Sequence, residues 1–122
     1  MAGIDRFEDL VAWQRARELV KEVYQVTATK TLSKDFGLRN QIQRAAVSIM
    51  ANIAEGFERF RQAEFHQFLS IAKASCAELR SHLYVALDIG YIDLATFDHL
   101  QQMSVETAKL IGALRASLRK DK

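Results

Sequence analysis

The stretch that decides the fold of this 122-residue chain is Gln41–Gly56, which reads QIQRAAVSIMANIAEG. Ile42 and Ile53 lie eleven residues apart within it, a spacing that places both side chains on one face of an α-helix. No proline interrupts the stretch, and the whole chain contains none. The pattern predicts a half-buried helix from about residue 35 to 55, with Gly56 as its C-cap.

Three further stretches show the same helical spacing of apolar residues. They run from Phe7 to about Ala28, from about Gln62 to Ile89, and onward from about Asp93. The expected end signals are Asp5 and Glu8 as an N-cap pair for the first, Gly90 as the C-cap of the second, and Asp93 as the N-cap of the third.

The segments between these helices are short, which favours antiparallel neighbours. Residues 27–34 are rich in Thr, Lys and Ser and predict the first turn. The sequence therefore predicts an all-α, up-down-up-down antiparallel four-helix bundle. It forms a single domain over residues 1–122, with termini that fray at about 1–5 and 118–122.

The composition favours a globular protein that stays in the cytoplasm. No apolar run approaches the ~20 residues that cross a bilayer, and the N-terminal residues lack the apolar core of a signal peptide. We therefore expect no membrane partner. The single cysteine, Cys76, is expected to be a small buried hydrophobe in a reducing compartment.

Charge is unevenly distributed along the chain, although the formal net charge is only +2. Residues 107–122 carry five basic and one acidic side chain, a net of +4. Residues 30–61 carry six basic and three acidic, a net of +3, whereas residues 62–106 carry two basic and six acidic, a net of −4. This asymmetry permits contact with a polyanion without requiring one.

Polar residues form a stripe along the helix of the deciding stretch. At 100° per residue they fall within about 80°, beside the apolar face. The stripe consists of Gln41, Arg44, Ser48, Asn52 and Glu55.

A helical hairpin that turns near residue 59 or 60 would set Arg44 opposite Ser75 and near Glu78, and Ser48 opposite Ile71. We expect a half-buried Arg44–Glu78 ion pair within a polar network that fixes register or forms a subunit interface. A ligand site is the second interpretation of this network, and a catalytic site is the third.

These residues resemble a known family, the 23S rRNA-intervening-sequence proteins, also called S23 proteins. The resemblance covers most of the chain, and its most specific part is Ala51–Gly56, reading ANIAEG. Further matches are FEDLVAWQ at 7–14, QIQRAAVSI at 41–49 and GYI at 90–92. The family pattern often has proline where Met50 stands, a departure that is expected to straighten the helix.

The resemblance implies a four-helix bundle and ring-shaped homo-oligomers, typically pentamers. Relatives include accessory proteins of diversity-generating retroelements, which look like basic pentameric barrels that work with a reverse transcriptase and nucleic acid. Our first hypothesis is therefore a non-enzymatic oligomeric module that binds RNA, or DNA, through phosphate contacts. The expected contacts are Arg59, Arg61, Phe57 and Phe60 in the turn after Gly56, together with Arg115, Arg119 and Lys120 in the tail.

The second hypothesis is a protein–protein interaction scaffold without nucleic-acid contact, in which acidic residues 62–106 face a basic partner or the next subunit. The two hypotheses differ in salt dependence, because phosphate contacts weaken steeply as salt rises.

An enzyme is the class that the sequence supports least. His66, His82 and His99 lack the i, i+3 or i, i+4 partner of a helical metal site and are expected at the surface. Cys76 has no nearby histidine, and the five glycines form no phosphate loop. We expect no metal and no cofactor.

Overall fold

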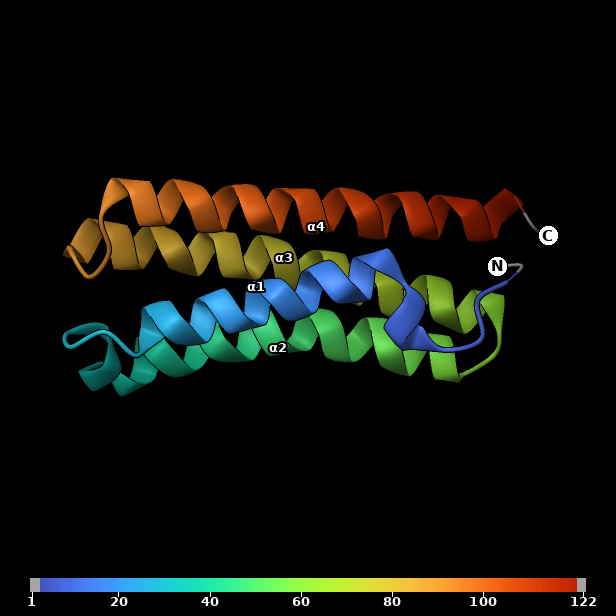
Figure 1. Cartoon of the computed structure of the whole chain (residues 1–122), viewed down its shortest axis with the longest axis horizontal. Helices are drawn as coiled ribbons and strands as arrows, with labels where there is room; N and C mark the ends of the chain where they lie inside the picture. Colours follow the sequence, from blue (N-terminus) through green and yellow to red (C-terminus); the bar gives the residue numbers. More distant parts are fainter. Residues whose placement is uncertain (1–2, 121–122) are drawn as a thin grey trace.

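The computed structural model describes residues 3–120, with side chains described for residues 3–118, and four α-helices lie within that range. They are α1 Val11–Thr27, α2 Phe36–Glu58, α3 Gln62–Ile89 and α4 Leu94–Lys120; the single-turn 3-10 helices η1 Phe7–Asp9 and η2 Leu32–Lys34 precede α1 and α2. Consecutive helices run in opposite directions (Figure 1). The predicted all-α antiparallel four-helix bundle is confirmed.

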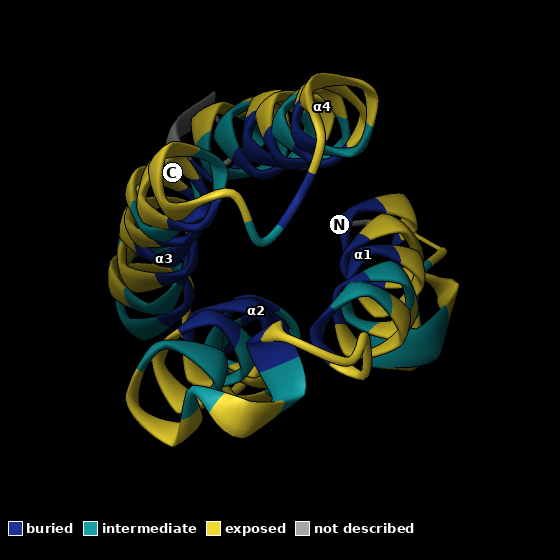
Figure 2. Ribbon diagram, turned by 90° about the vertical axis from the view of Figure 1, so that its left-hand side faces the viewer, coloured by how far each residue is buried: buried dark blue, intermediate teal, exposed yellow. Residues whose placement is uncertain are grey.

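The core lies along the axis that the four helices surround (Figure 2). Leu19, Ile49, Leu79 and Leu100, one from each helix, are fully buried. Burying an apolar side chain of this size stabilises a fold by about 1.5–3 kcal/mol. Each helix thus contributes one apolar stripe, and the outward faces remain free for polar residues.

The start of α1 differs from the prediction. The expected cap pair Asp5 and Glu8 is wrong, because α1 begins at Val11 and no side chain caps it. The single-turn helix η1 lies between Asp5 and the start of α1. The ring of Phe7 packs edge-on against Trp13, with the ring centroids 5.2 Å apart. Aromatic packing, rather than a carboxylate cap, fixes how the chain enters the first helix.

The predicted C-cap at Gly56 is also wrong, because α2 continues to Glu58. Gly56 is buried inside the helix, where an added Cβ would lie 2.6 Å from the Cβ of Phe68 and 3.0 Å from the Phe65 ring. The glycine is therefore required by the close approach of α2 to α3, and not by a left-handed turn.

The end of α3 and the start of α4 follow the prediction. Gly90 closes α3 in the left-handed conformation, with φ of 91°, and Asp93 Oδ1 accepts a 2.8 Å hydrogen bond from the Thr96 N–H. At the same end of the bundle, the Tyr91 hydroxyl donates to Asp35 Oδ2 at 3.0 Å. α4 extends to Lys120 and buries Leu118, beyond where the sequence predicted fraying.

The register of α2 against α3 differs from the prediction by one helical turn. Ser48 meets Ser75, with 3.0 Å between the two Oγ atoms, and not Ile71 as predicted. The turn itself lies at residues 59–61, close to the predicted 59 or 60. The predicted register is wrong because residues equidistant from this turn do not face each other.

Candidate nucleic-acid interface

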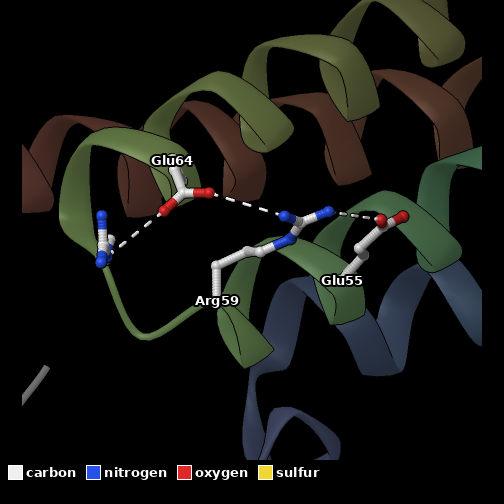
Figure 3. Close-up of polar contacts among 4 residues, drawn as sticks. Glu55, Arg59 and Glu64 are labelled. Atoms are coloured by element: carbon white, nitrogen blue, oxygen red, sulfur yellow. Dashed lines mark hydrogen bonds and ion pairs between the residues drawn. The ribbon is translucent and has the colours of Figure 1, made fainter.

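The two turn arginines that the sequence nominated for phosphate contact are ion-paired within the chain. Arg59 Nη2 lies 3.1 Å from Glu55 Oε1, and Arg59 Nη1 lies 3.6 Å from Glu64 Oε1 (Figure 3). Arg61 Nε lies 3.7 Å from Glu64 Oε2, and the Arg59 guanidinium also stacks 5.1 Å above the Phe68 ring. Phosphate would have to displace carboxylates here, which makes the turn a weak anion site.

The two turn aromatics have different environments. Phe57 is buried in the core, whereas Phe60 is 79% exposed, and their ring centroids lie 6.2 Å apart. Phe60 adopts a φ of 57°, a left-handed conformation that is uncommon for a residue with a side chain. Only Phe60 of this pair is therefore accessible to a ligand.

The basic tail is described in part. Arg115 is half-buried, and its Nε is buried without a hydrogen-bond partner. Arg119 and Lys120 belong to the last turn of α4, but their side chains lie outside the described residues. Of the three predicted tail contacts, only Arg115 can be placed.

Arg115 opens onto a groove between α3 and α4, which we call the basic groove. It is lined by Ser70, Lys73, Ala74, Ala77, Arg80, Ala108 and Arg115. Three of these residues are cationic, none is acidic, and most of the others are small. Within residues 3–118, Lys73, Arg80 and Arg115 form no ion pair with a carboxylate.

The charges of the basic groove affect the pKa of Cys76, which is buried in the core beneath the groove. Burial raises the pKa of the Cys76 thiol to about 11, and the nearby charges of Arg80 and Lys73 oppose that rise. Cys76 is a buried free cysteine, as predicted. Arg80 and Lys73 therefore act electrostatically on the core beneath them, and among the described residues neither forms an ion pair with a carboxylate.

Sequence reasoning missed Lys73 and Arg80 because they were counted within an acidic region. The six acidic residues of 62–106 dominate the sum, but they do not line the basic groove. The signal was available: the two cations are seven residues apart, which places both on one face of a helix. Small residues, Ala74 and Ala77, stand between them.

Two residues of the polar stripe, Ser48 and Asn52, belong to a hydrogen-bond network at the seam where α2 meets α3. The Ser48 and Ser75 hydroxyls are hydrogen-bonded, and Asn52 Nδ2 donates to both the backbone oxygen and the hydroxyl of Ser48, at 2.8 and 2.9 Å. Ser75 Oγ also donates to the backbone oxygen of Ile71 at 3.1 Å. The hydroxyl and amide part of the predicted network is present.

The charged part of that network is absent. Arg44 and Glu78 are both exposed, and no ion pair joins them in the part of the chain that the structure describes. The predicted half-buried Arg44–Glu78 pair is therefore wrong within the described residues of one chain, because both residues are exposed and no ion pair joins them. Gln41 is also exposed, and Glu55 is engaged by Arg59 instead.

The histidines occupy different environments. His99 is at the surface as predicted, with Nε2 3.2 Å from Glu22 Oε1. His66 and His82 are half-buried, with buried Nε2 atoms, so the surface prediction is wrong for these two. Across the described residues, no group of three or more His, Cys, Asp or Glu side chains is arranged to hold a metal ion.

The sequence of residues 8–113 matches the model of one protein family, described as 23S rRNA-intervening sequence protein. The chain belongs to this family. The match spans all of α1, α2 and α3 and most of α4, so it includes the turn residues 57–61 and the cations Lys73 and Arg80.

A solved structure supports the family assignment. It comes from Bacteroides thetaiotaomicron and is described as a protein with unknown function from the S23 ribosomal protein family. It is 25% identical in sequence, the similarity covers 86% of this chain and 98% of that chain, and the TM-score is 0.78. Neither the family description nor that of the solved structure names an enzymatic activity.

A comparison with curated proteins gives no match. Across the described residues, each helix lacks an apolar run sufficient for a membrane span.

Proposed function

We propose that this chain is a cytoplasmic, non-enzymatic module that binds nucleic acid, and RNA in particular, through phosphate contacts in the basic groove. One observation carries the proposal: Lys73, Arg80 and Arg115 line one groove, and no carboxylate is among its described lining residues. Lys and Arg contacts to phosphate supply most sequence-independent affinity for nucleic acids. The buried, unpartnered Nε of Arg115 adds a donor that an anion would satisfy.

We further propose that the protein acts as a homo-oligomer, with a pentameric ring as the expected form. This part rests on the family resemblance, and its physical reason is multivalency. One groove with three cations binds a polyanion weakly, whereas several grooves on one ring engage the same strand at high effective concentration. Light scattering would then report about 70 kDa, five times the 13.9 kDa chain.

The test of the proposed function compares charge removal inside and outside the basic groove. Fluorescence anisotropy measures the affinity of a labelled mixed-sequence RNA for the wild type and for Lys73→Gln/Arg80→Gln. The matched control is Lys30→Gln/Lys34→Gln, which removes the same charge from exposed residues near the first turn. Light scattering of each protein confirms that all are compared in the same assembly state.

The groove variant should bind RNA at least tenfold more weakly than the control at low salt. Two lost phosphate contacts also reduce the slope of log K against log salt by about 1.4 for a single strand. Equal affinities for the groove variant and its control would contradict the proposal.

A protein-interaction scaffold is the second candidate, and one observation favours it. Phe36, Ile89 and Leu94 are 64%, 56% and 62% exposed at the end of the bundle that holds the first and third interhelical connections (Figure 1). Exposed apolar residues that gather at one place commonly mark an interaction surface. Binding to a partner there would depend little on salt, because buried apolar area drives it.

A further inference from the structure

An exposed aromatic residue stands at one end of the basic groove. Tyr84 follows Arg80 by one helical turn on α3, and its side chain is 55% exposed. Its ring packs edge-on against Phe97 of α4, with the ring centroids 4.8 Å apart at an interplanar angle of 65°. Because Phe97 is buried, it holds the exposed ring of Tyr84 in place.

The two cations of α3 and Tyr84 lie on one line along the helix. Arg80 is seven residues after Lys73 and Tyr84 is eleven residues after it, so all three directions fall within about 40° around the helix axis. At a rise of 1.5 Å per residue, Lys73 and Arg80 are separated by about 10 Å along the axis, and Tyr84 lies about 6 Å further. Tyr84 therefore follows the two cations of the basic groove along the same face of α3.

Acidic residues lie near the face of α3 that carries Lys73, Arg80 and Tyr84, but none lies between these three residues on that face. Between Ser70 and Tyr84 the only acidic residue of α3 is Glu78. It lies five residues after Lys73, which places it about 140° around the helix from that cation. Asp88 lies one helical turn beyond Tyr84 on α3, and Asp98 follows Phe97 on α4. Both residues are exposed. The cationic stretch thus ends at the aromatic ring.

We propose that the basic groove takes single-stranded nucleic acid, with an unpaired base stacked on Tyr84 and the adjoining phosphates held by Arg80, Lys73 and Arg115. This inference rests on the proposed function and narrows its ligand to one class. A cationic groove that tracks the backbone, with an aromatic ring beside it, suits single strands because their bases have free faces. In a duplex the bases are stacked on one another, and no face is available to Tyr84.

The test uses two probes and matched tyrosine variants. The probes are a single-stranded RNA of about 12 nucleotides, within the range of known single-strand sites, and a duplex of the same length. The variants are Tyr84→Ala, Tyr84→Phe, which keeps the ring, and Tyr24→Ala, which removes an exposed tyrosine of α1. Lys73→Gln/Arg80→Gln is measured in parallel, and a polyglutamate peptide serves as a competitor.

Tyr84→Ala should weaken binding of the single strand by about 5- to 150-fold, the range of one lost base–aromatic stack. Binding of the duplex should be unchanged, and Tyr84→Phe and Tyr24→Ala should bind the single strand as the wild type does. If circular dichroism shows that Tyr84→Ala is unfolded, Tyr84→Trp replaces it. Quenching of its added indole fluorescence by the single strand then supports stacking, and no quenching overturns it.

The outcomes separate the two proposals. If Tyr84→Ala binds the single strand like the wild type while the lysine–arginine variant loses affinity, stacking is overturned and the proposed function stands. If the wild type binds neither RNA, or the lysine–arginine variant binds as tightly as the wild type, both are overturned. Competition by polyglutamate as effective as competition by RNA would show an acidic-peptide site and would also overturn the inference.

Discussion

Replacing Gly56 by alanine tests the close approach of α2 to α3. Alanine favours a helix interior by about 1 kcal/mol over glycine. The new Cβ would lie 2.6 Å from the Phe68 Cβ, well inside the usual carbon–carbon contact of 3.5–4.0 Å. The Phe68 Cβ is bonded directly to the α3 backbone, so the helix itself must shift, at an overpacking cost of about 1–3 kcal/mol.

Because the 2.6 Å contact is with an atom bonded to the α3 backbone, the overpacking cost falls in the upper part of this range, about 2–3 kcal/mol, and the balance for Gly56→Ala is a loss of about 1–2 kcal/mol. A chain of this length has an unfolding entropy near 0.26 kcal/mol/K, so the melting temperature should fall by about 4–8 °C. Gly112→Ala is the matched control, since its nearest neighbour is the mobile Lys73 Nζ at 3.5 Å. The control should gain about 2–4 °C from helix propensity alone.

Differential scanning calorimetry at one protein concentration measures both variants, because any self-association makes the melting temperature depend on concentration. If Gly56→Ala gains stability as Gly112→Ala does, the close contact at Gly56 and the register derived from it are refuted.

Three further outcomes follow from the contacts within the chain. Ser48→Ala removes a hydrogen-bonded hydroxyl from the seam and should cost about 1–2 kcal/mol in urea unfolding. In a double-mutant cycle with Ser75→Ala the losses should be less than additive, and simple additivity would disprove the pairing. The hydrogen bond to Asp35 raises the pKa of Tyr91 above its ordinary value of 10.0, so its stabilising effect is present below pH 10 and is lost as pH rises through the folded pKa. The urea concentration at the midpoint of unfolding should therefore fall more for the wild type than for Tyr91→Phe between pH 9 and 11. An equal fall in the two proteins would contradict this assignment. Burial raises the pKa of Cys76 to about 11, so its reaction with a disulfide reagent at pH 8 should accelerate only when denaturant opens the bundle; rapid reaction of the native protein would show that the thiol is accessible.

The fold was predictable from the sequence because apolar spacing and end signals agreed for most of the chain. Gly90 and Asp93 act as the sequence indicates, the first by a left-handed conformation and the second by accepting a backbone hydrogen bond. Gly56 misled because glycine serves two purposes, helix ending and close helix contact, and only the structure distinguishes them. The α2–α3 register was a separate error, because the turn lies at residues 59–61 as predicted but Ser48 faces Ser75 and not Ile71.

The candidate site was harder to predict because it depends on which charges meet across helices. Arg59 and Arg61 stand out in the sequence beside two phenylalanines, but Glu55 and Glu64 neutralise them in the folded chain. Lys73 forms its groove with residues of α4 that are far away in the sequence. A net charge counted along the chain cannot show such a groove, because the acidic residues of the same region face elsewhere.

The most direct test of the account is to map where RNA contacts the protein. A single-stranded RNA containing 4-thiouridine is cross-linked to the wild-type protein at near-physiological salt, and mass spectrometry identifies the modified peptides. Cross-links are expected within residues 70–84 of α3 and 105–115 of α4, the segments that contain Tyr84 and the lining residues of the basic groove. Cross-links confined to residues 55–61, or none above those of an unrelated acidic protein, would contradict it.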